Sequence, residues 1–228
     1  MILILGASGY IGGYLFNYLK SNENFELVGT YFKRASQNFI HFDLALSSPE
    51  KLLDKYEIKY VILAAESHKK LDDYKEHWSK AYHVNVYCLK NFLDLCFKRN
   101  ITPIYISTDN VFDGLKGNYK ENDHRNPITS YGKMRYEIEN HIIGASVSYS
   151  ILRMGSVFGI EQSDGTLITG LFNEIKHKKK VLCATDQVIT PVFIGDLISF
   201  ISKVIENNYK GVFHIASLKP ITRYEIAE

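Results

Sequence analysis

Short runs of apolar and β-branched residues alternate along the chain with longer segments in which apolar residues recur every three or four positions. The short runs predict strands near residues 1–5, 26–31, 39–42, 60–64, 102–107 and 148–153, with shorter strands near 181–184 and 212–215. The periodic segments predict helices near residues 10–21, 48–56, 77–99, 130–143, 166–178 and 195–207, and Asp196 is a candidate cap for the last. This alternation indicates βαβ units and a parallel sheet buried on both faces.

Six such strands predict an α/β fold with a Rossmann-type, doubly wound parallel sheet. Sheets of this kind bind ligands at the carboxyl ends of their strands, so one rim should gather the loops that follow Leu5, Tyr31, Ala64, Ser107 and Arg153. We expect residues 1–154 to form a dinucleotide-binding domain. Residues 155–228 should form a small, abbreviated substrate-binding lid packed on it, with residues 181–215 partly returning to the sheet.

Composition narrows the class of protein. A net charge of +2 on 228 residues gives no electrostatic case for nucleic acid or a membrane surface. No apolar run reaches membrane-spanning length, and the apolar start passes directly into glycines, which indicates a buried strand rather than a signal peptide. Three cysteines and eight histidines lack metal-ligand spacing, so we expect no metal and a cytoplasmic location.

A glycine-rich loop follows the first predicted strand and opens a helix. Glycine permits a tight turn and close approach of the backbone, while the amides at a helix start attract a pyrophosphate. We therefore expect a dinucleotide to contact Gly6, Ser8, Gly9, Tyr10, Ile11 and Gly12.

The second predicted strand ends in Tyr31-Phe32-Lys33-Arg34, where an NAD-selective site would place an acidic residue on the ribose. The two cations Lys33 and Arg34 suit a 2′-phosphate, because a guanidinium offers paired donors to phosphate oxygens. The alternative is that both are solvated loop residues. The sequence favours NADP(H) over NAD(H), with Tyr31 beside the adenosine ribose.

Tyr131 and Arg135 lie one helical turn apart on the predicted helix 130–143. A tyrosine followed four residues later by lysine supplies the acid and its electrostatic partner in a large class of nicotinamide-dependent reductases. Here arginine takes the place of that lysine. Thr108 and Asp109 reach the same rim from the fifth predicted strand.

These motifs occur in an order that resembles the dTDP-4-dehydrorhamnose reductase family of extended short-chain dehydrogenases, which act on nucleotide-linked 4-keto sugars. The resemblance covers the whole chain and is carried by the glycine loop at Gly6, Asp43-Leu44, Ala64-Ala65, Val84-Asn85, Ser107 to Gly114, Asn126-Pro127, Ser130-Tyr131-Gly132, Leu152-Arg153, Asp186-Gln187, Thr190-Pro191 and Phe213-His214-Ile215-Ala216.

The resemblance implies a reaction and a set of residue roles. Hydride would pass from the nicotinamide to a sugar ketone while Tyr131 donates a proton, Thr108 orients the ketone oxygen and Arg135 stands for the lysine that holds the ribose. It also implies cofactor contacts at Asp43, Leu44, Ala64, Ala65, Asn85 and Ser107. Substrate contacts are expected at Asp109, Asn110, Val111, Phe112 and Ser156.

Three positions depart from the family pattern and leave alternatives open. Arg135 replaces the lysine, and either it is a helix-surface cation beside an inactive site or it forms a slow but working pair with Tyr131. Asn110 replaces a usual tyrosine, and without a second carboxylate beside Asp109 it disfavours dehydratase chemistry. Asp109 either contacts the sugar or only closes a turn. Ser156 replaces a usual tryptophan and enlarges the pocket.

The family normally continues beyond residue 228. We expect either an abbreviated sugar site or one completed by a partner, in a homodimer or by a different chain. Two functions remain open: an NADP(H)-dependent reductase of a nucleotide sugar, or a non-catalytic NADP-binding regulatory or scaffold subunit of the same fold.

Overall fold

A seven-stranded parallel sheet forms the centre of the computed structural model, which describes residues 1–22, 24–65, 71–161, 166–177 and 181–228. The strand order is β10-β6-β5-β4-β1-β2-β3, where β1 is Ile2–Leu5, β2 Leu27–Tyr31, β3 Ile40–His41, β4 Tyr60–Leu63, β5 Thr102–Thr108, β6 Ser150–Met154 and β10 Gly211–Ile215. All neighbouring strands in this sheet run parallel. The predicted Rossmann-type fold is confirmed, and β10, which corresponds to the shorter strand predicted near 212–215, is the seventh strand of the sheet.

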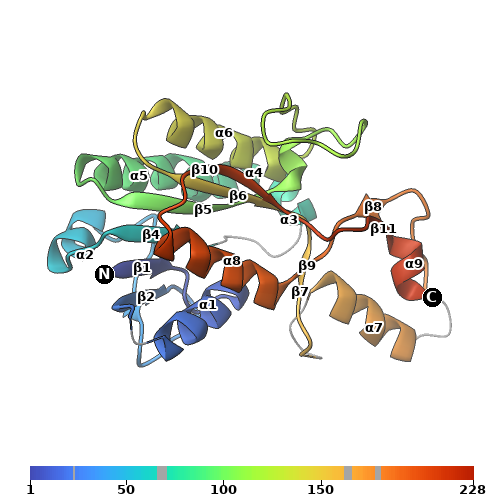
Figure 1. Cartoon of the computed structure of the whole chain (residues 1–228), viewed down its shortest axis with the longest axis horizontal. Coiled ribbons are helices and arrows are strands. Elements are labelled where there is room, and N and C mark those ends of the chain that lie inside the picture. The colour runs from blue at the N-terminus through green and yellow to red at the C-terminus, as the bar shows by residue number, and fades with distance from the viewer. Residues whose placement is uncertain (23, 66–70, 162–165, 178–180) are drawn as a thin grey trace.

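Helices cover both faces of the sheet (Figure 1). One face packs against α1 (Tyr10–Ser21) and α8 (Ile194–Glu206), and the other against α2 (Pro49–Lys55), α4 (Trp78–Tyr82), α5 (Leu89–Lys98) and α6 (Ser130–Gly144). Successive residues of a strand point to opposite faces, so Ile4 joins the first layer and Leu5 the second. Both are almost fully buried, which explains why the strands are continuous apolar runs.

The long helix predicted over 77–99 is interrupted. A short helix α3 (Leu71–Glu76) precedes α4, and a π-helix, His83–Cys88, separates α4 from α5. The hydrogen bonds of a π-helix span five residues instead of four, and such turns occur as short insertions within α-helices, so the sequence pattern predicted one continuous helix. Asp196 is not the cap of α8: Phe193 holds that position, and Asp196 lies in the first turn, where its charge complements the helix dipole.

The last third of the chain builds small elements beside the carboxyl ends of the strands. β7 (Val157–Phe158) pairs in parallel with β9 (Val192–Phe193), and β8 (Val188–Ile189) pairs antiparallel with β11 (Ile221–Thr222). Together with α7 (Leu167–His177) and α9 (Arg223–Ala227) they lie to one side of the sheet (Figure 1).

The strand predicted at residues 181–184 is wrong. That segment is irregular and Leu182 is 87% exposed. Within the described residues no strand pairs with it to satisfy its backbone groups. The domain boundary at residues 154 and 155 stays a prediction, although α8 and β10 do return to the main sheet from within the second region.

Candidate active site at the carboxyl ends of the strands

The glycine loop has a shape that only glycine fits. Gly6 has φ of +89°, and its amide donates to Thr30 Oγ1 at 3.0 Å. A Cβ added at Gly6 would lie 2.7 Å from the Ala65 Cα, and one at Gly12 would lie 2.2 Å from the Gly6 carbonyl oxygen. Both neighbours are backbone atoms, which cannot move aside. The loop is therefore held tightly between β2 and the end of β4.

The start of α1 is suited to an anion. Gly9 is its N-cap, no side chain caps the helix, and its first turn contains no acidic residue. The first amides of a helix lack partners within the helix and carry its positive dipole end. Ser8, Tyr10 and Ile11, all partly buried, flank this point as predicted from their position in the loop. The residues present fit the pyrophosphate of a dinucleotide.

The end of β2 presents cations to solvent. Lys33 and Arg34 are both exposed, and Lys33 Nζ lies 5.6 Å from the centre of the Phe32 ring. In the described part of the chain neither cation forms an ion pair with a carboxylate. Nearby, an Asp43 carboxylate oxygen accepts a hydrogen bond from the Ala45 amide at 2.9 Å, which fixes the turn after β3. Whether these groups contact a cofactor stays a prediction.

Thr108 ends β5 and organises the turn that follows it. Its hydroxyl oxygen accepts from the Asn110 amide at 3.2 Å, and the hydroxyl lies 3.1 Å from an Asp109 carboxylate oxygen, to which it donates. The Asn110 side-chain amide donates to the same carboxylate at 3.0 Å. Asp109 therefore closes this turn, and it is also accessible to solvent. Although part of the residue is exposed, the surrounding protein partly desolvates its carboxyl group and raises the pKa of Asp109 above its ordinary value.

Helix α6 begins against this turn. Thr129 caps it by accepting from the Gly132 amide at 3.0 Å. A Cβ at Gly132 would lie 2.1 Å from the Asn110 carbonyl oxygen, so the helix and the turn are in direct backbone contact. This contact places Tyr131, which precedes Gly132, beside the Thr108 turn. The Tyr131 ring is partly buried and lies 5.1 Å from the ring of Tyr74 on α3.

Arg135 is buried, with 8% of its surface exposed, so the interpretation as a helix-surface cation is wrong. Its guanidinium carbon lies 4.9 Å from the centre of the Tyr131 ring and 5.6 Å from that of Tyr105. Nη1 donates to the Tyr105 hydroxyl at 3.1 Å and reaches the Ile106 carbonyl at 3.5 Å. The cation thus joins the face of Tyr131 to β5. Lys133, two residues earlier, is exposed and does not take its place.

Four further residues expected at the ligand differ in their burial and contacts. Val111 is fully buried and Phe112 is 6% exposed, so their side chains present little surface at the rim, and their contact with a substrate stays a prediction. The Ser107 hydroxyl donates to buried Glu139 at 2.5 Å. Ser156 is exposed, and its carbonyl accepts from the Val192 amide at 2.9 Å.

Two of the remaining expected cofactor residues adjoin the glycine loop. Ala64 follows β4, and its amide donates to the Leu5 carbonyl at 3.0 Å, so Ala64 and Ala65 adjoin the glycine loop. Asn85 lies in the π-helix and is partly buried, as is Leu44.

Sequence reasoning missed a buried ionic network next to this rim. Glu139 on α6 has no exposed surface and accepts from Arg153 Nη2 at 2.8 Å, from Arg125 Nη1 at 2.8 Å and from Ser107. Arg153 also donates through Nε to both carboxylate oxygens at 3.1 Å. The sequence does contain a signal for this network. Glu139 is a carboxylate on the apolar face of the helix, and Arg153 lies on the neighbouring strand.

The network continues into the loop after β5. Arg153 Nη1 donates to the Glu121 carbonyl at 2.9 Å and lies 3.3 Å from His214 Nε2. His214 Nδ1 lies 3.1 Å from the Tyr119 carbonyl, which can only accept, so Nδ1 carries the proton and Nε2 accepts. Desolvation and the adjacent Arg153 charge hold the pKa of His214 below its ordinary value.

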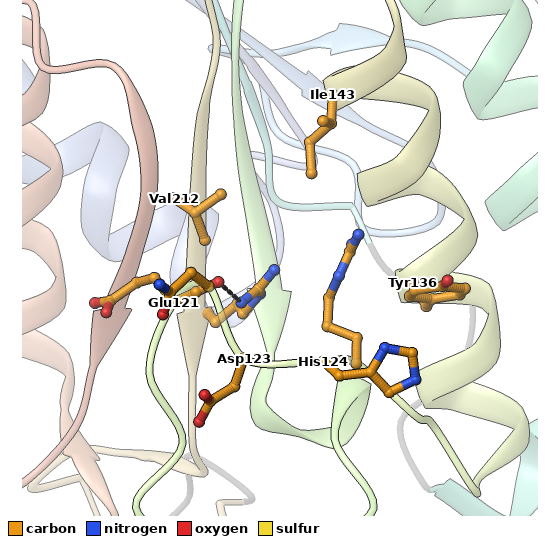
Figure 2. A pocket seen from close by; sticks show the side chains of 9 residues that line it. Glu121, Asp123, His124, Tyr136, Ile143 and Val212 are labelled. Atoms are coloured by element: carbon orange, nitrogen blue, oxygen red, sulfur yellow. Dashed lines mark hydrogen bonds between the residues drawn. The ribbon is translucent and has the colours of Figure 1, made fainter.

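A cavity of about 250 Å³ borders this network, between the loop at 121–125, α6, β6 and β10 (Figure 2). Its lining residues are Glu121, Asn122, Asp123, His124, Arg125, Tyr136, Ile143, Arg153 and Val212. None of the residues expected to contact cofactor or substrate lines it, so the cavity is distinct from the rim. Among the described residues, no three histidine, cysteine or acidic side chains gather as a metal site, and no helix is long and apolar enough to cross a membrane.

The parallel sheet and its glycine loop place the protein among the Rossmann-type nucleotide-binding folds. The chain belongs to the family described as the RmlD substrate binding domain, whose model matches residues 1–228. This confirms the resemblance inferred from the motifs.

Two curated relatives differ in kind. Methionine adenosyltransferase 2 subunit beta of Bos taurus is 27% identical over 233 residues, covering 99% of this chain and 70% of that protein. A dTDP-4-dehydrorhamnose reductase of Aggregatibacter actinomycetemcomitans is also 27% identical, covering 99% and 76%. Among solved structures, a hypothetical dTDP-4-dehydrorhamnose reductase from Sulfolobus tokodaii superposes with a TM-score of 0.86 at 28% identity, over 99% of this chain and 79% of that chain.

Proposed function

We propose that the protein is an NADP(H)-dependent reductase of a nucleotide-linked 4-keto sugar. The observation that carries this proposal is the stack of Tyr131 on buried Arg135, on a helix that starts against the Thr108 turn. The glycine loop lies at the same edge of the sheet. A tyrosine, a fixed cation and a hydroxyl beside a dinucleotide loop are the parts that carbonyl reduction requires.

Bound NADPH would supply the hydride, and the chain's own residues would handle the proton and the geometry. Tyr131 would donate its phenolic proton to the ketone oxygen as negative charge develops there. Thr108 would turn its hydroxyl from Asp109 to the same oxygen and so orient the ketone. Arg135 would keep a positive charge at the face of the Tyr131 ring, which favours the phenolate left after proton transfer.

Cofactor binding is tested by two neighbouring glycines. A Cβ at Gly12 would meet the Gly6 carbonyl oxygen at 2.2 Å, whereas one at Gly13 would lie in ordinary contact, 3.5 Å from the Ala7 carbonyl oxygen. We expect Gly12→Ala to weaken NADPH binding by at least tenfold in a fluorescence titration and Gly13→Ala to leave it nearly unchanged. A ~10-fold loss corresponds to ~1.4 kcal/mol of binding free energy. Equal affinities of the two variants would contradict binding at this loop.

Catalysis is tested by mixing the protein with NADPH and a panel of dTDP- and GDP-linked 4-keto sugars and following absorbance at 340 nm. We expect turnover with at least one sugar, and a loss of at least ~100-fold in Tyr131→Phe, which is the usual contribution of one general acid. Tyr131→Phe keeps the ring that stacks on Arg135, so its fold and NADPH affinity should match the wild type. Turnover no higher than that of the variant would defeat the enzymatic proposal.

A second function is favoured by the contacts of Arg135 and by one relative. The guanidinium donates into the protein, to Tyr105 and the Ile106 carbonyl, as expected of a group that fastens α6 to β5. The chain is also 27% identical to the methionine adenosyltransferase subunit. A non-catalytic, NADP(H)-binding regulatory or scaffold subunit would combine these features.

Arg135→Lys distinguishes the two functions. If Arg135 works as an accepted partner of Tyr131, the substitution should change turnover little. If the natural protein is a binding subunit, lysine should create activity where none was present, or leave the protein inactive while NADPH still binds.

A further inference from the structure

The edge strand β3 adds a histidine to the cationic end of β2. His41 pairs directly with Tyr31 in the parallel register, and paired residues on adjacent strands project to the same face of the sheet. The two rings meet edge to face at 5.3 Å, and the His41 ring lies 6.4 Å from that of Phe32. Lys33 Nζ stands 5.6 Å from the centre of the same Phe32 ring. The His41 imidazole and the Lys33 ammonium group therefore both lie near the exposed ring of Phe32.

This group adjoins the glycine loop through Thr30. The Thr30 hydroxyl accepts from the Gly6 amide, and the Ser8 amide reaches the Thr30 carbonyl at 3.4 Å. Tyr31 follows Thr30 directly, and His41, Phe32 and Lys33 are all exposed. A ligand whose phosphates occupy the loop would extend toward this end of β2.

We propose that His41 is a specificity-determining residue that binds the 2′-phosphate of NADP(H) together with Lys33 and Arg34, and that it makes the preference for the phosphorylated cofactor depend on pH. This inference rests on the proposed cofactor. Histidine changes charge between about pH 5 and 8, and a dianionic phosphate favours its charged form. The contribution of His41 to phosphate binding grows as the pH falls.

The surrounding charges agree with this assignment. β3 is the edge strand, so β2 is its neighbour in the sheet, and the charged groups at that strand end are Lys33 and Arg34. Two residues after His41 along the chain, the Asp43 carboxylate accepts through Oδ1 from the Ala45 amide. One added charge about 5 Å from a phosphate charge in water changes affinity by about fourfold.

The test compares the whole chain with His41→Gln, measuring the Kd of NADP⁺ and NAD⁺ by calorimetry at pH 6.0 and 8.0. His177→Gln, at the exposed end of α7, is the matched control. Protonation of the cofactor phosphate affects the Kd of both proteins equally, so it cancels in the ratio of variant to wild-type Kd. We expect that ratio for NADP⁺ to be about four at pH 6.0 and near one at pH 8.0. For NAD⁺, and for the control with either nucleotide, it should stay near one.

The outcomes separate the inference from the function on which it rests. If NADP⁺ binds but its affinity is unaffected by His41→Gln at both pH values, the role of His41 is wrong and the cofactor proposal stands. Equal weakening of NADP⁺ and NAD⁺ binding also overturns it, because the residue would then act on the fold or on the shared nucleotide. If neither nucleotide binds the wild-type chain, the proposed function and this inference fail together.

Discussion

Replacing Glu139 with glutamine should destabilise the protein far more than the same change elsewhere on α6. Glu139 has no exposed surface and receives hydrogen bonds from Ser107, Arg125 and Arg153. Glutamine keeps the shape and one acceptor oxygen, so Ser107 retains a partner. Its amide group, however, turns two donors toward arginine N–H groups, and the arginines lose their counter-charge.

The size of the effect follows from burial. The side chain of Arg153 is 2% exposed and that of Arg125 is 17% exposed, so the cation left behind at Arg153 has almost no water to replace the carboxylate. Removing one partner of a buried ion pair costs about 3–5 kcal/mol. For 228 residues the entropy of unfolding is roughly 0.48 kcal/mol/K, which converts this loss to a fall in Tm of roughly 6–10 °C.

The assay is urea unfolding at pH 7 followed by circular dichroism, with Tm from calorimetry. Glu137→Gln is the matched control on the same helix. Glu137 bonds Lys90 and Tyr82 at the surface, with its side chain 35% exposed. An exposed pair contributes about 1 kcal/mol or less, so this variant should unfold close to the wild type. If the two variants lost the same stability, the reasoning from burial and charge would be refuted.

Three further predictions concern Gly132 at the rim, His214 in the ionic network and Cys96 in the core. Gly132→Ala should lower Tm and any turnover, because its Cβ would collide with a carbonyl oxygen, whereas Gly144→Ala has open space and should do neither. Because the pKa of His214 is lowered in the folded state, the unfolded chain binds a proton at this residue at a higher pH than the folded chain does. The free energy of unfolding should therefore fall as the pH drops below about 6.5. In urea titrations, the difference in this free energy between wild type and His214→Gln should shrink from pH 7.5 to pH 5.5. Burial raises the pKa of Cys96 to about 12, so its thiol should not react at pH 8 in the folded protein. Iodoacetamide at that pH should label the partly exposed Cys183 and should label Cys96 only after unfolding. Mass spectrometry of the peptides measures both.

The features that the sequence predicted well are those set by local spacing. The glycine loop is one: Gly6 and Gly12 are six residues apart, and the strand before them and the helix after them determine where they lie. The burial of the sheet on both faces also follows from uninterrupted apolar runs such as Tyr60–Leu63. The predicted strand at 181–184 shows the limit, because a β-rich run forms a strand only where another strand is available to pair with it.

The features that it could not predict depend on contacts between distant residues. The family motif predicted substrate contacts at Val111 and Phe112, and it gave no sign that the turn after Thr108 buries both side chains. The network around Glu139 joins residues that are 14 and 32 positions away in the chain, at Arg153 and Ser107. No periodic pattern encodes such a network, because it exists only once α6 packs on β5 and β6.

The exchange of lysine for arginine illustrates the same limit. From the sequence, Arg135 was either an idle surface cation or a partner of Tyr131, and only the packing of α6 on β5 decides between them. The packing removes the first alternative, since the guanidinium is buried and spans the faces of Tyr131 and Tyr105. A lysine ammonium carries three donors on a flexible stem, whereas a guanidinium carries five in a rigid fork. Arg135 can therefore donate to β5 through Nη1 and keep its charge against the Tyr131 ring. Whether it also supports catalysis then depends on which groups its guanidinium contacts when a dinucleotide is bound.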